Sequence, residues 1–463
     1  MPVVRIAEIL THRTLVARLP DGDSDGAVEC TGSFPYIYTG DLPYNLPDAN
    51  RQDPNMRIII PQTGGSPDPD DVIGRDDAIA RIVAGARQGN NHLLSDPRRM
   101  GKTSLLIRLC DQPDDDVTAV KIDLEGCVTA EAVVVRILRG IGGLSTLKDR
   151  TTRMIKAALG DGAIDVGAGP LTLHGVAKAA GPLATLESCI SAINADLDSK
   201  ASKGKASKGK AIVIVALDEV TIAAEAIARR DADECHQLLQ TLRHLRGDAN
   251  PRVRWILSGS IGFHHVLRKA NATEGLINDL AFVELGPLGH NHAVDLTQAL
   301  LDGIRRRADL GVINRLIDRT NAIPFMLHNA LHRLDGAASP VANGPITIDE
   351  AEAAFTTYLS DRGQSGAWTH LVTRVDSYYD NPTLATAILD EQAISNEALS
   401  FDAVGAAHPD VDVNELRTLI DHLVDDHYLD QNTLVWRYPI LRKTWMLRRR
   451  ITPTTNTTTG TTQ

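Results

Sequence analysis

The chain has 463 residues, and its 48 Lys and Arg against 59 Asp and Glu give a formal net charge of −11. Apolar residues make up 43% and charged residues 23%, which is the composition of a folded globular protein. The length corresponds to roughly two to four domains. Because no run of about 18 uncharged apolar residues occurs, we expect no membrane span, and the acid excess disfavours broad nucleic-acid binding.

The cysteines and the first residues predict a cytoplasmic protein. Five cysteines are scattered along the chain without a CxxC pair, which argues against a disulfide framework or a zinc site and suits a reducing compartment. The segment MPVVRIAEILTHRTL has no basic stretch followed by a long apolar one, so we expect no secretory signal.

Residues 1–70 are predicted to form a small β-rich region with linkers. The runs VVRIAEIL, RTLVARL and RIII are typical of short strands. Asp, Gly and Pro interrupt them, and the stretches DLPYNLPDANRQDP and QTGGSPDPDD are typical of extended linkers.

From residue 71 onward, predicted strands alternate with predicted helices. A helix is expected within 71–90, a strand over 91–95, a helix from Gly101, a strand over 118–124 and a helix over 130–141. After an irregular, partly helical stretch over 143–200, further buried strands are expected over 211–220 and 252–260, with helix over 221–247 between them. This alternation predicts an α/β fold with a parallel sheet.

Composition identifies two flexible segments and a change of pattern near the C-terminus. The repeat KASKGKASKGK over 200–210 is typical of a solvated loop, and residues 452–463 are low in complexity and expected to be disordered. Residues 287–345 are predicted to be helical. From 346, short helices are expected to end in a hairpin and a last helix within DDHYLDQNTLVWRYPILRKTW.

The strongest motif is the run from Asp96 to Thr103, DPRRMGKT, between a predicted strand and a predicted helix. Such a loop presents backbone N–H groups to phosphate at a helix N-terminus. Lys102 would neutralise the β- and γ-phosphates, and the Thr103 hydroxyl would bind Mg²⁺. The motif usually begins with glycine where this chain has Asp96, and a chance GKT at a helix start is the alternative.

The predicted strand IVIVAL ends in two carboxylates, Asp218 and Glu219. Ligands of doubly wound sheets lie at this carboxyl edge. Asp218 therefore suits Mg²⁺ ligation through water, and Glu219 suits activation of an attacking water. On the next strand, Ser260 or alternatively Ser258 could contact the γ-phosphate or that water, although a plain turn is also compatible.

Taken in order, the segments IGRDDAI, PRRMGKTSLL, DLEG, IVIVALDEV and WILSGSIG resemble the archaeal-type and STAND-like branch of AAA-related P-loop ATPases. The resemblance extends over about 70–450, because TNAIPF and a terminal winged-helix pattern follow in the expected order. It implies an ATPase core over 71–285, a helical lid over 286–345 and a winged-helix-like domain over 346–451.

The resemblance also implies the roles of individual residues. Gly74 and Arg75 would lie near adenine, while Asp218 and Glu219 would be the Mg²⁺ and water residues and Ser260 the sensor. The residues implied around the phosphates are Pro97, Arg98, Arg99, Met100, Gly101, Lys102, Thr103 and Ser104. Pro324 matches the proline of the Gly-x-Pro lid motif, but Ala322 replaces its glycine. ATP as the nucleotide follows from the family, and no Asn/Thr-Lys-x-Asp guanine motif occurs.

Other charged and histidine residues give no second site by sequence. We expect Arg229, Arg230, Arg246 and Arg268 to be solvated surface residues, although each is a candidate arginine finger. The histidines include the pair His264-His265, but without a metal-binding spacing such as HExxH they are expected to be structural.

Three functions remain open, and we rank an ATP-hydrolysing molecular switch first. The second is a DNA-binding ATPase of the origin-recognition or loader type; its expected recognition helix within 410–426 is rich in carboxylates, with Arg417 as its one basic residue. The third is an ATP-binding scaffold without turnover.

The distribution of charge favours a protein partner. Residues 346–463 carry 9 Lys and Arg against 17 Asp and Glu, although the strip 437–450 holds six basic residues and no acid. We therefore expect an acidic output domain that contacts a protein. The sequence leaves the oligomeric state open, a homo-oligomer included.

Overall fold

The computed structural model describes three short strands within residues 1–56 and most of residues 57–452. The gaps in the second range are 113–115, 146, 161–172, 202–210, 248–250, 336–343, 361–365 and 396, and the side chains of 200–201 and 366–371 are also outside the description. The predicted loop over 200–210 and the predicted tail fall almost wholly outside it. The chain divides into two compact units, residues 1–56 and 57–463.

The first unit contains an antiparallel sheet, in agreement with the predicted β-rich region. Its strands are β1 (Arg5–Ile9), β2 (Thr14–Arg18) and β3 (Val28–Thr31), in that order across the sheet. The expected strand RIII is absent from residues 57–60, which belong to the second unit. There Ile59 is buried, and its N–H donates to the carbonyl of Ala299 at 3.0 Å.

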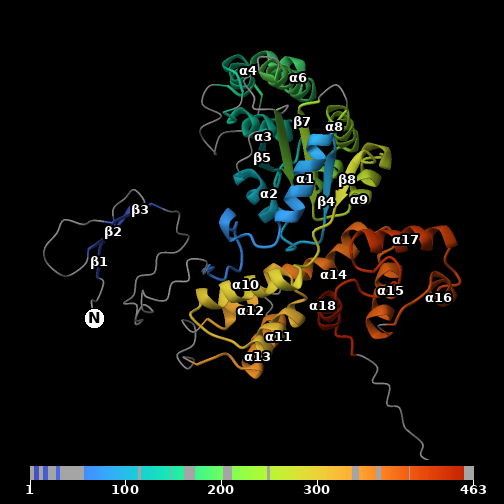
Figure 1. Cartoon of the computed structure of the whole chain (residues 1–463). Helices are drawn as coiled ribbons and strands as arrows, with labels where there is room; N and C mark the ends of the chain where they lie inside the picture. Colours follow the sequence, from blue (N-terminus) through green and yellow to red (C-terminus); the bar gives the residue numbers. More distant parts are fainter. Residues whose placement is uncertain are drawn as a thin grey trace, which may run out of the picture. The chain divides into compact units, whose positions relative to one another are not determined.

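The second unit is built on a parallel sheet with strand order β5-β6-β7-β4-β8 (Figure 1). The strands are β4 (Asn91–Ser95), β5 (Val117–Asp123), β6 (Ile212–Asp218), β7 (Val253–Gly259) and β8 (Leu280–Val283). Sequence analysis predicted the first four and missed β8. Strand β6 is buried along its whole length, as its continuous apolar run predicts.

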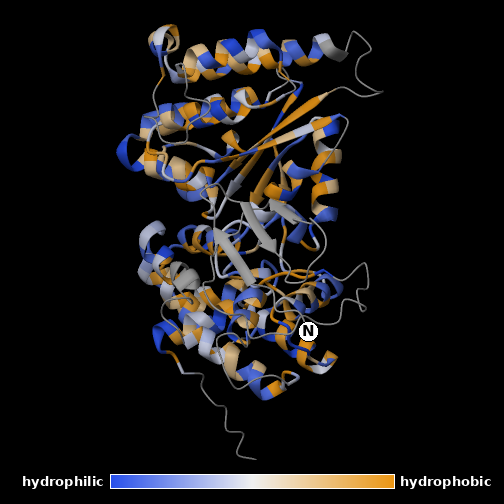
Figure 2. Ribbon diagram, turned by 90° about the vertical axis from the view of Figure 1, so that its left-hand side faces the viewer, coloured by the Kyte–Doolittle hydropathy of each residue, from blue (hydrophilic) through white to orange (hydrophobic). Residues whose placement is uncertain are grey.

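Alternate residues of the strands feed two hydrophobic cores, one on each face of the sheet. Val213, Val215 and Leu217 of β6 belong to one core, and Ile212 and Ile214 to the other. This follows from the two-residue period of a strand. Figure 2 shows the hydrophobic residues concentrated along the strands of this sheet.

Helices on the two faces complete the α/β layers. The first core includes residues of α3 (Ala130–Gly142), α4 (Asp149–Leu159), α6 (Pro182–Ala201), α7 (Val220–Arg230), α8 (Ala232–Leu245) and α9 (Phe263–Lys269); α5 (Gly175–Ala180) lies between α4 and α6 in sequence. The second includes residues of α1 (Asp76–Gln88) and α2 (Lys102–Asp111). The helix expected over 221–247 is divided at Asp231, whose side chain caps α8 by accepting from the Glu234 N–H at 2.9 Å.

The remainder of the unit is helical, as predicted. Helices α10 (His290–Gly303), α11 (Leu310–Thr320) and α12 (Pro324–Arg333) share a third core, to which Ile59 also belongs. They are followed by α13 (Ile348–Ser360), α14 (Gly366–Tyr378), α15 (Pro382–Ser395), α16 (Phe401–Ala407), α17 (Val413–Asp425) and α18 (Pro439–Arg449). The expected hairpin before α18 is reduced to one antiparallel bridge, Leu429 to Trp436.

Within the described ranges, no helix is both long enough and apolar enough to cross a bilayer.

Candidate functional site

The loop between β4 and α2 places Lys102 at the start of a helix. Two residues before it take left-handed backbone conformations, Arg99 with φ 73° and Gly101 with φ 97°, and these turn the chain sharply into α2. The Lys102 ammonium is buried, and it donates to the carbonyl of Pro97 at 3.0 Å and to that of Asp96. Burial lowers the pKa of Lys102 to about 8, although the Glu219 and Asp96 carboxylates act in the opposite direction.

Asp96, the departure from the usual loop glycine, points away from the loop interior. Its buried carboxylate accepts the N–H of Leu285 at 3.0 Å and the N–H of Gly286 at 3.2 Å. These amides belong to the connection between β8 and α10. The Asp96 carboxylate therefore binds this connection, and Asp96 does not line the cavity described below.

Arg75 also binds this connection, through backbone carbonyls. Its guanidinium donates to the carbonyls of Leu285 at 3.1 Å, Gly286 at 3.0 Å and Met100 at 2.7 Å. Gly74 has φ 71°, and a Cβ there would lie 2.7 Å from the Cβ of His292 in α10. Arg75 thus contacts the connection that precedes α10, and Gly74 packs closely against α10 itself. Neither residue lines the cavity.

Asp218 and Thr103 lie side by side at the carboxyl edge of the sheet. The Thr103 hydroxyl donates to Asp218 Oδ2 at 2.9 Å, and the Ser258 hydroxyl donates to Oδ1 at 3.0 Å. Lys121 of the neighbouring strand lies 3.5 Å from Oδ2. A hydroxyl and an adjoining carboxylate are the oxygen donors that Mg²⁺ prefers, so this pair fits that ion.

Glu219 follows Asp218 in a left-handed conformation, with φ 55°, at the start of α7. A non-glycine residue adopts this conformation rarely, and Glu219 lines the cavity described below. The Ser260 hydroxyl donates to Glu219 Oε2 at 2.8 Å, and Arg98 Nε donates to the Ser260 oxygen at 3.3 Å. Ser260 therefore contacts the site through Glu219, whereas Ser258 contacts it through Asp218.

Some of these groups line a cavity of about 340 Å³, within the range of about 300–1,000 Å³ found for small-molecule sites. Eight of the residues singled out by sequence line it: Arg98, Arg99, Gly101, Lys102, Thr103, Ser104, Glu219 and Pro324. Six others do not: Gly74, Arg75, Pro97, Met100, Asp218 and Ser260.

Sequence reasoning gave no role to seven of the residues that line this cavity. The additional lining residues are Gln62, Gly64, Gly65, Pro67, Glu125, Phe325 and His328. The backbone N–H of Gln62 donates to His328 Nδ1 at 3.1 Å, which places the proton of a neutral imidazole on Nε2. Burial lowers the pKa of His328 to about 4, so the ring is neutral near pH 7. The Gly-rich stretch over 62–67, predicted to be only a linker, was the available signal.

The loop between β4 and α2 is also packed against later helices of the chain. Met100 is fully buried in a core shared with Phe355 and Tyr358 of α13, and the guanidinium of Arg99 lies 4.4 Å from the centre of the Phe325 ring. His427, which follows α17, lies with Nε2 2.6 Å from the carbonyl oxygen of Ser95. Helices far along the chain thus contact the loop directly.

The four candidate arginine fingers are all engaged within this chain. Arg229 pairs with Glu225 and Arg230 with Glu234. Arg246 was expected to be solvated, but it is buried and pairs with Asp279 at 2.9 Å. Arg268 pairs with Asp380 at 3.0 Å, and it donates to the Tyr378 carbonyl at 2.6 Å.

Comparison with known proteins supports the fold. No family model matches the sequence, and no curated protein matches it. Among solved structures, the Walker-type ATPase of Pyrococcus abyssi is similar to this chain with a TM-score of 0.53 and 15% identity, covering 82% of this chain and 98% of its own. The ORC2 protein of Aeropyrum pernix, in complexes with ADPNP and ADP, gives a TM-score of 0.43 and 11% identity over 81% of this chain and 94% of its own. The first of these similarities shows that the chain has the fold of a P-loop ATPase.

Proposed function

We propose that the chain binds ATP with Mg²⁺, hydrolyses it and acts as a molecular switch of the AAA/STAND-like type. The observation that carries the proposal is that Lys102, Thr103 and Glu219 line one cavity at the carboxyl edge of a P-loop sheet, while Asp218 accepts a hydrogen bond from the Thr103 hydroxyl at 2.9 Å. If the GKT sequence occurred by chance, there would be no reason for the carboxylates of Asp218 and Glu219 to lie beside it.

Each residue has a role that its position supports. Lys102 moves from the carbonyls of Asp96 and Pro97 to the phosphates, and the N–H groups at the start of α2 bind phosphate oxygens. Thr103 and Asp218 would hold Mg²⁺, which when bound neutralises phosphate charge. Glu219 accepts a proton from the attacking water, while Ser260 holds the Glu219 carboxylate in position.

We place the base of the nucleotide at the end of the cavity formed by Gln62, Pro67, Phe325 and His328. Phe325 and Pro67 supply apolar surface, and the Nε2 proton of His328 is a donor for a ring nitrogen of adenine. Arg75 and Gly74, which the family resemblance puts near adenine, would act indirectly by positioning the connection to α10.

The switch would operate through the contacts between the loop and the helices beyond it. Nucleotide binding has to rearrange Lys102, and Met100 and His427 connect the same loop to the C-terminal helices. We propose that residues 71–285 form the ATPase core, 286–345 a lid, and 346–451 a winged-helix-like domain whose acidic surface contacts a protein partner. The chain would act as a monomer or as a homo-oligomer, in the cytoplasm.

A DNA-binding ATPase is the second candidate, and the basic strip 437–450 is the feature that favours it. Its weakness is that Arg437 pairs with Glu284, and Arg449 pairs with Asp390 with Nε 2.6 Å from Oδ1, so these charges are already partly neutralised. Duplex affinity that falls steeply with salt, and that is lost on replacing Arg448 and Arg450, would establish this alternative.

Phosphate release measured with and without Mg²⁺ tests the proposal. Turnover that disappears in Glu219→Gln, with ATP binding retained, supports an ATPase and excludes a scaffold that only binds. Wild-type protein that binds ATP without turnover would establish the scaffold, and protein that binds no nucleotide would overturn the proposal.

A further inference from the structure

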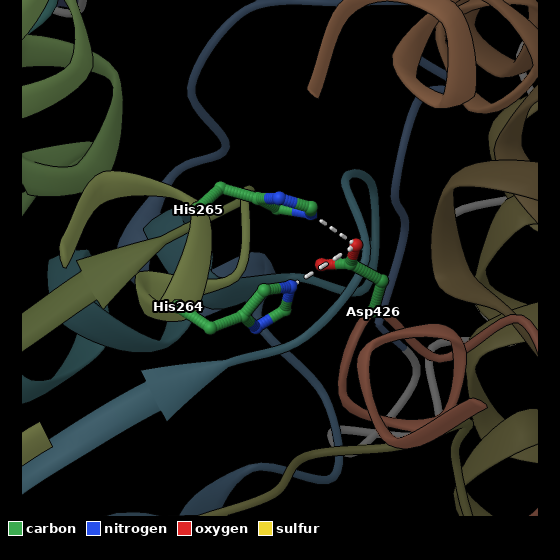
Figure 3. Close-up of side chains that lie close together, drawn as sticks. All are labelled: His264, His265 and Asp426. Carbon is green, nitrogen blue, oxygen red and sulfur yellow. Dashed lines mark hydrogen bonds and ion pairs between the residues drawn. The ribbon is translucent and has the colours of Figure 1, made fainter. Parts of the chain in front are cut away.

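Two histidines and a carboxylate meet where the ATPase core contacts the C-terminal helices. His264 and His265 lie in α9, and Asp426 directly follows α17 as its C-cap, about 160 positions later in the chain. His265 Nε2 lies 2.7 Å from Asp426 Oδ2, and His264 Nε2 lies 3.7 Å from the same oxygen (Figure 3). Among the described residues, this is the group of His, Cys, Asp and Glu whose ligand atoms lie within 4.8 Å of one another.

Hydrogen bonding does not account for all of this cluster. The side chain of His264 is 10% exposed, and its Nε2 is buried without a hydrogen-bond partner although it faces Asp426. A buried imidazole nitrogen without a partner is uncommon, because it loses its hydrogen bonds to water and gains none in return. A ligand between the three side chains would supply the missing interaction.

We propose that His264, His265 and Asp426 bind a divalent transition metal ion, with zinc as the best fit. Two imidazoles and one carboxylate form a typical three-residue zinc set, with water in the fourth position. Bonds of about 2.0–2.1 Å in a tetrahedron put neighbouring ligand atoms roughly 3.3 Å apart. The separations of 2.7 and 3.7 Å from the Asp426 oxygen lie on either side of this value, and all three ligand atoms lie within 4.8 Å of one another, so adjustments of about 1.5 Å or less would complete the site.

The surroundings of Asp426 suit a ligand that has to be held in one orientation. The Gly262 N–H donates to Oδ1 at 3.1 Å, and the Tyr379 hydroxyl donates to Oδ2 at 2.6 Å. A Cβ on Gly262 would lie 2.6 Å from Oδ1, so glycine permits this approach. Hydrogen bonds of this kind orient metal ligands and tune their affinity.

Zinc at this position would connect the core to the C-terminal helices near the catalytic edge. His264 follows Ser260 by four residues, and Ser260 holds the carboxylate of Glu219. The ion would therefore strengthen the contact through which the C-terminal helices reach the phosphate loop. Sequence spacing gave no sign of this, because the third ligand comes from a distant helix.

The test is titration of the purified full chain, freed of metal by a chelator, with Zn²⁺ and with Co²⁺. We expect one ion per chain, the visible absorption of tetrahedral Co²⁺, and a rise in melting temperature with Zn²⁺. His264→Ala removes a ligand whose Nε2 has no hydrogen-bond partner, so this variant is expected to fold. Loss of a group that only hydrogen-bonds to a metal ligand lowers metal affinity roughly 10–100-fold. Since His264→Ala removes a ligand itself, its affinity for Zn²⁺ should fall by more than this.

His332→Ala, which removes an exposed histidine outside the cluster, is the matched control and should bind as wild type does. Asp426→Asn keeps the size of the side chain, and it should also lose metal. Circular dichroism tests whether each variant is folded. If His264→Ala is not folded, the metal affinity of Asp426→Asn decides whether the cluster binds the ion. Absence of stoichiometric binding in the wild type, or full binding in the folded variants, would overturn the proposal.

Discussion

Raising the pH should weaken ATP binding, because Lys102 loses its charge in an accessible range. Burial lowers the pKa of this side chain to about 8 when no nucleotide is bound. A bound triphosphate favours the ammonium form and so raises the pKa again, which means that binding takes up protons wherever Lys102 was neutral beforehand.

The size of the effect follows from this pKa. With a pKa of about 8, Lys102 is roughly 90% protonated at pH 7 and roughly 10% protonated at pH 9. If only the ammonium form binds, affinity falls about tenfold over these two units, which is about 1.4 kcal/mol. Proton uptake per nucleotide should rise from about 0.1 at pH 7 to about 0.5 at pH 8 and about 0.9 at pH 9.

Isothermal titration calorimetry in buffers of different ionisation enthalpy measures affinity and proton uptake together. Between pH 8 and 9 the terminal phosphate, with a pKa near 6–7, is already ionised, so the protons taken up are assigned to the protein. Lys102→Arg is the control, because its guanidinium stays charged and its residual affinity should be flat over this range. Constant wild-type affinity without proton uptake between pH 8 and 9 would refute the reasoning.

Three substitutions test other parts of the structure. Asp96→Ala leaves two backbone amides without their acceptor, so the free energy of unfolding, measured with urea, should fall by about 2–4 kcal/mol; a fall below about 1 would contradict this role. Ala322 has φ 52°, and Ala322→Gly should therefore raise the free energy of unfolding by about 0.5–1 kcal/mol, whereas a loss of stability would be inconsistent with the strain. His328→Ala should weaken ATP binding about tenfold by calorimetry while His332→Ala leaves it unchanged, and equal affinities would remove His328 from the base site.

The sheet could be predicted from sequence where long apolar runs define its strands. The run that forms β6 is continuous, and the carboxylates that follow it are placed by the rule that parallel strands end at one edge. Strand β8 has four residues, one of them Phe282 with 58% of its surface exposed, so it lacks both the length and the burial that give a clear signal.

Parts of the site that depend on tertiary contacts could not be predicted. Asp96 looked unfavourable for phosphate binding because its partners, the amides of Leu285 and Gly286, lie nearly 190 residues away. The stretch around Gln62 was predicted to be a linker because glycine and proline dominate it, yet it lines the cavity, and the Gln62 N–H donates to His328 Nδ1 at 3.1 Å. Local patterns describe strand, helix and loop, and they carry no information about such distant pairs.

The most direct test of the central claim is ATP binding and phosphate release measured side by side for the wild type, Lys102→Ala and Glu219→Gln. We expect Mg²⁺-dependent binding and turnover in the wild type and loss of binding in Lys102→Ala. In Glu219→Gln, binding should be retained while turnover falls by about 10²–10⁴-fold. Turnover in Glu219→Gln at the rate of the wild type, or ATP affinity unchanged in Lys102→Ala, would contradict the assignment of this cavity as the site of ATP hydrolysis.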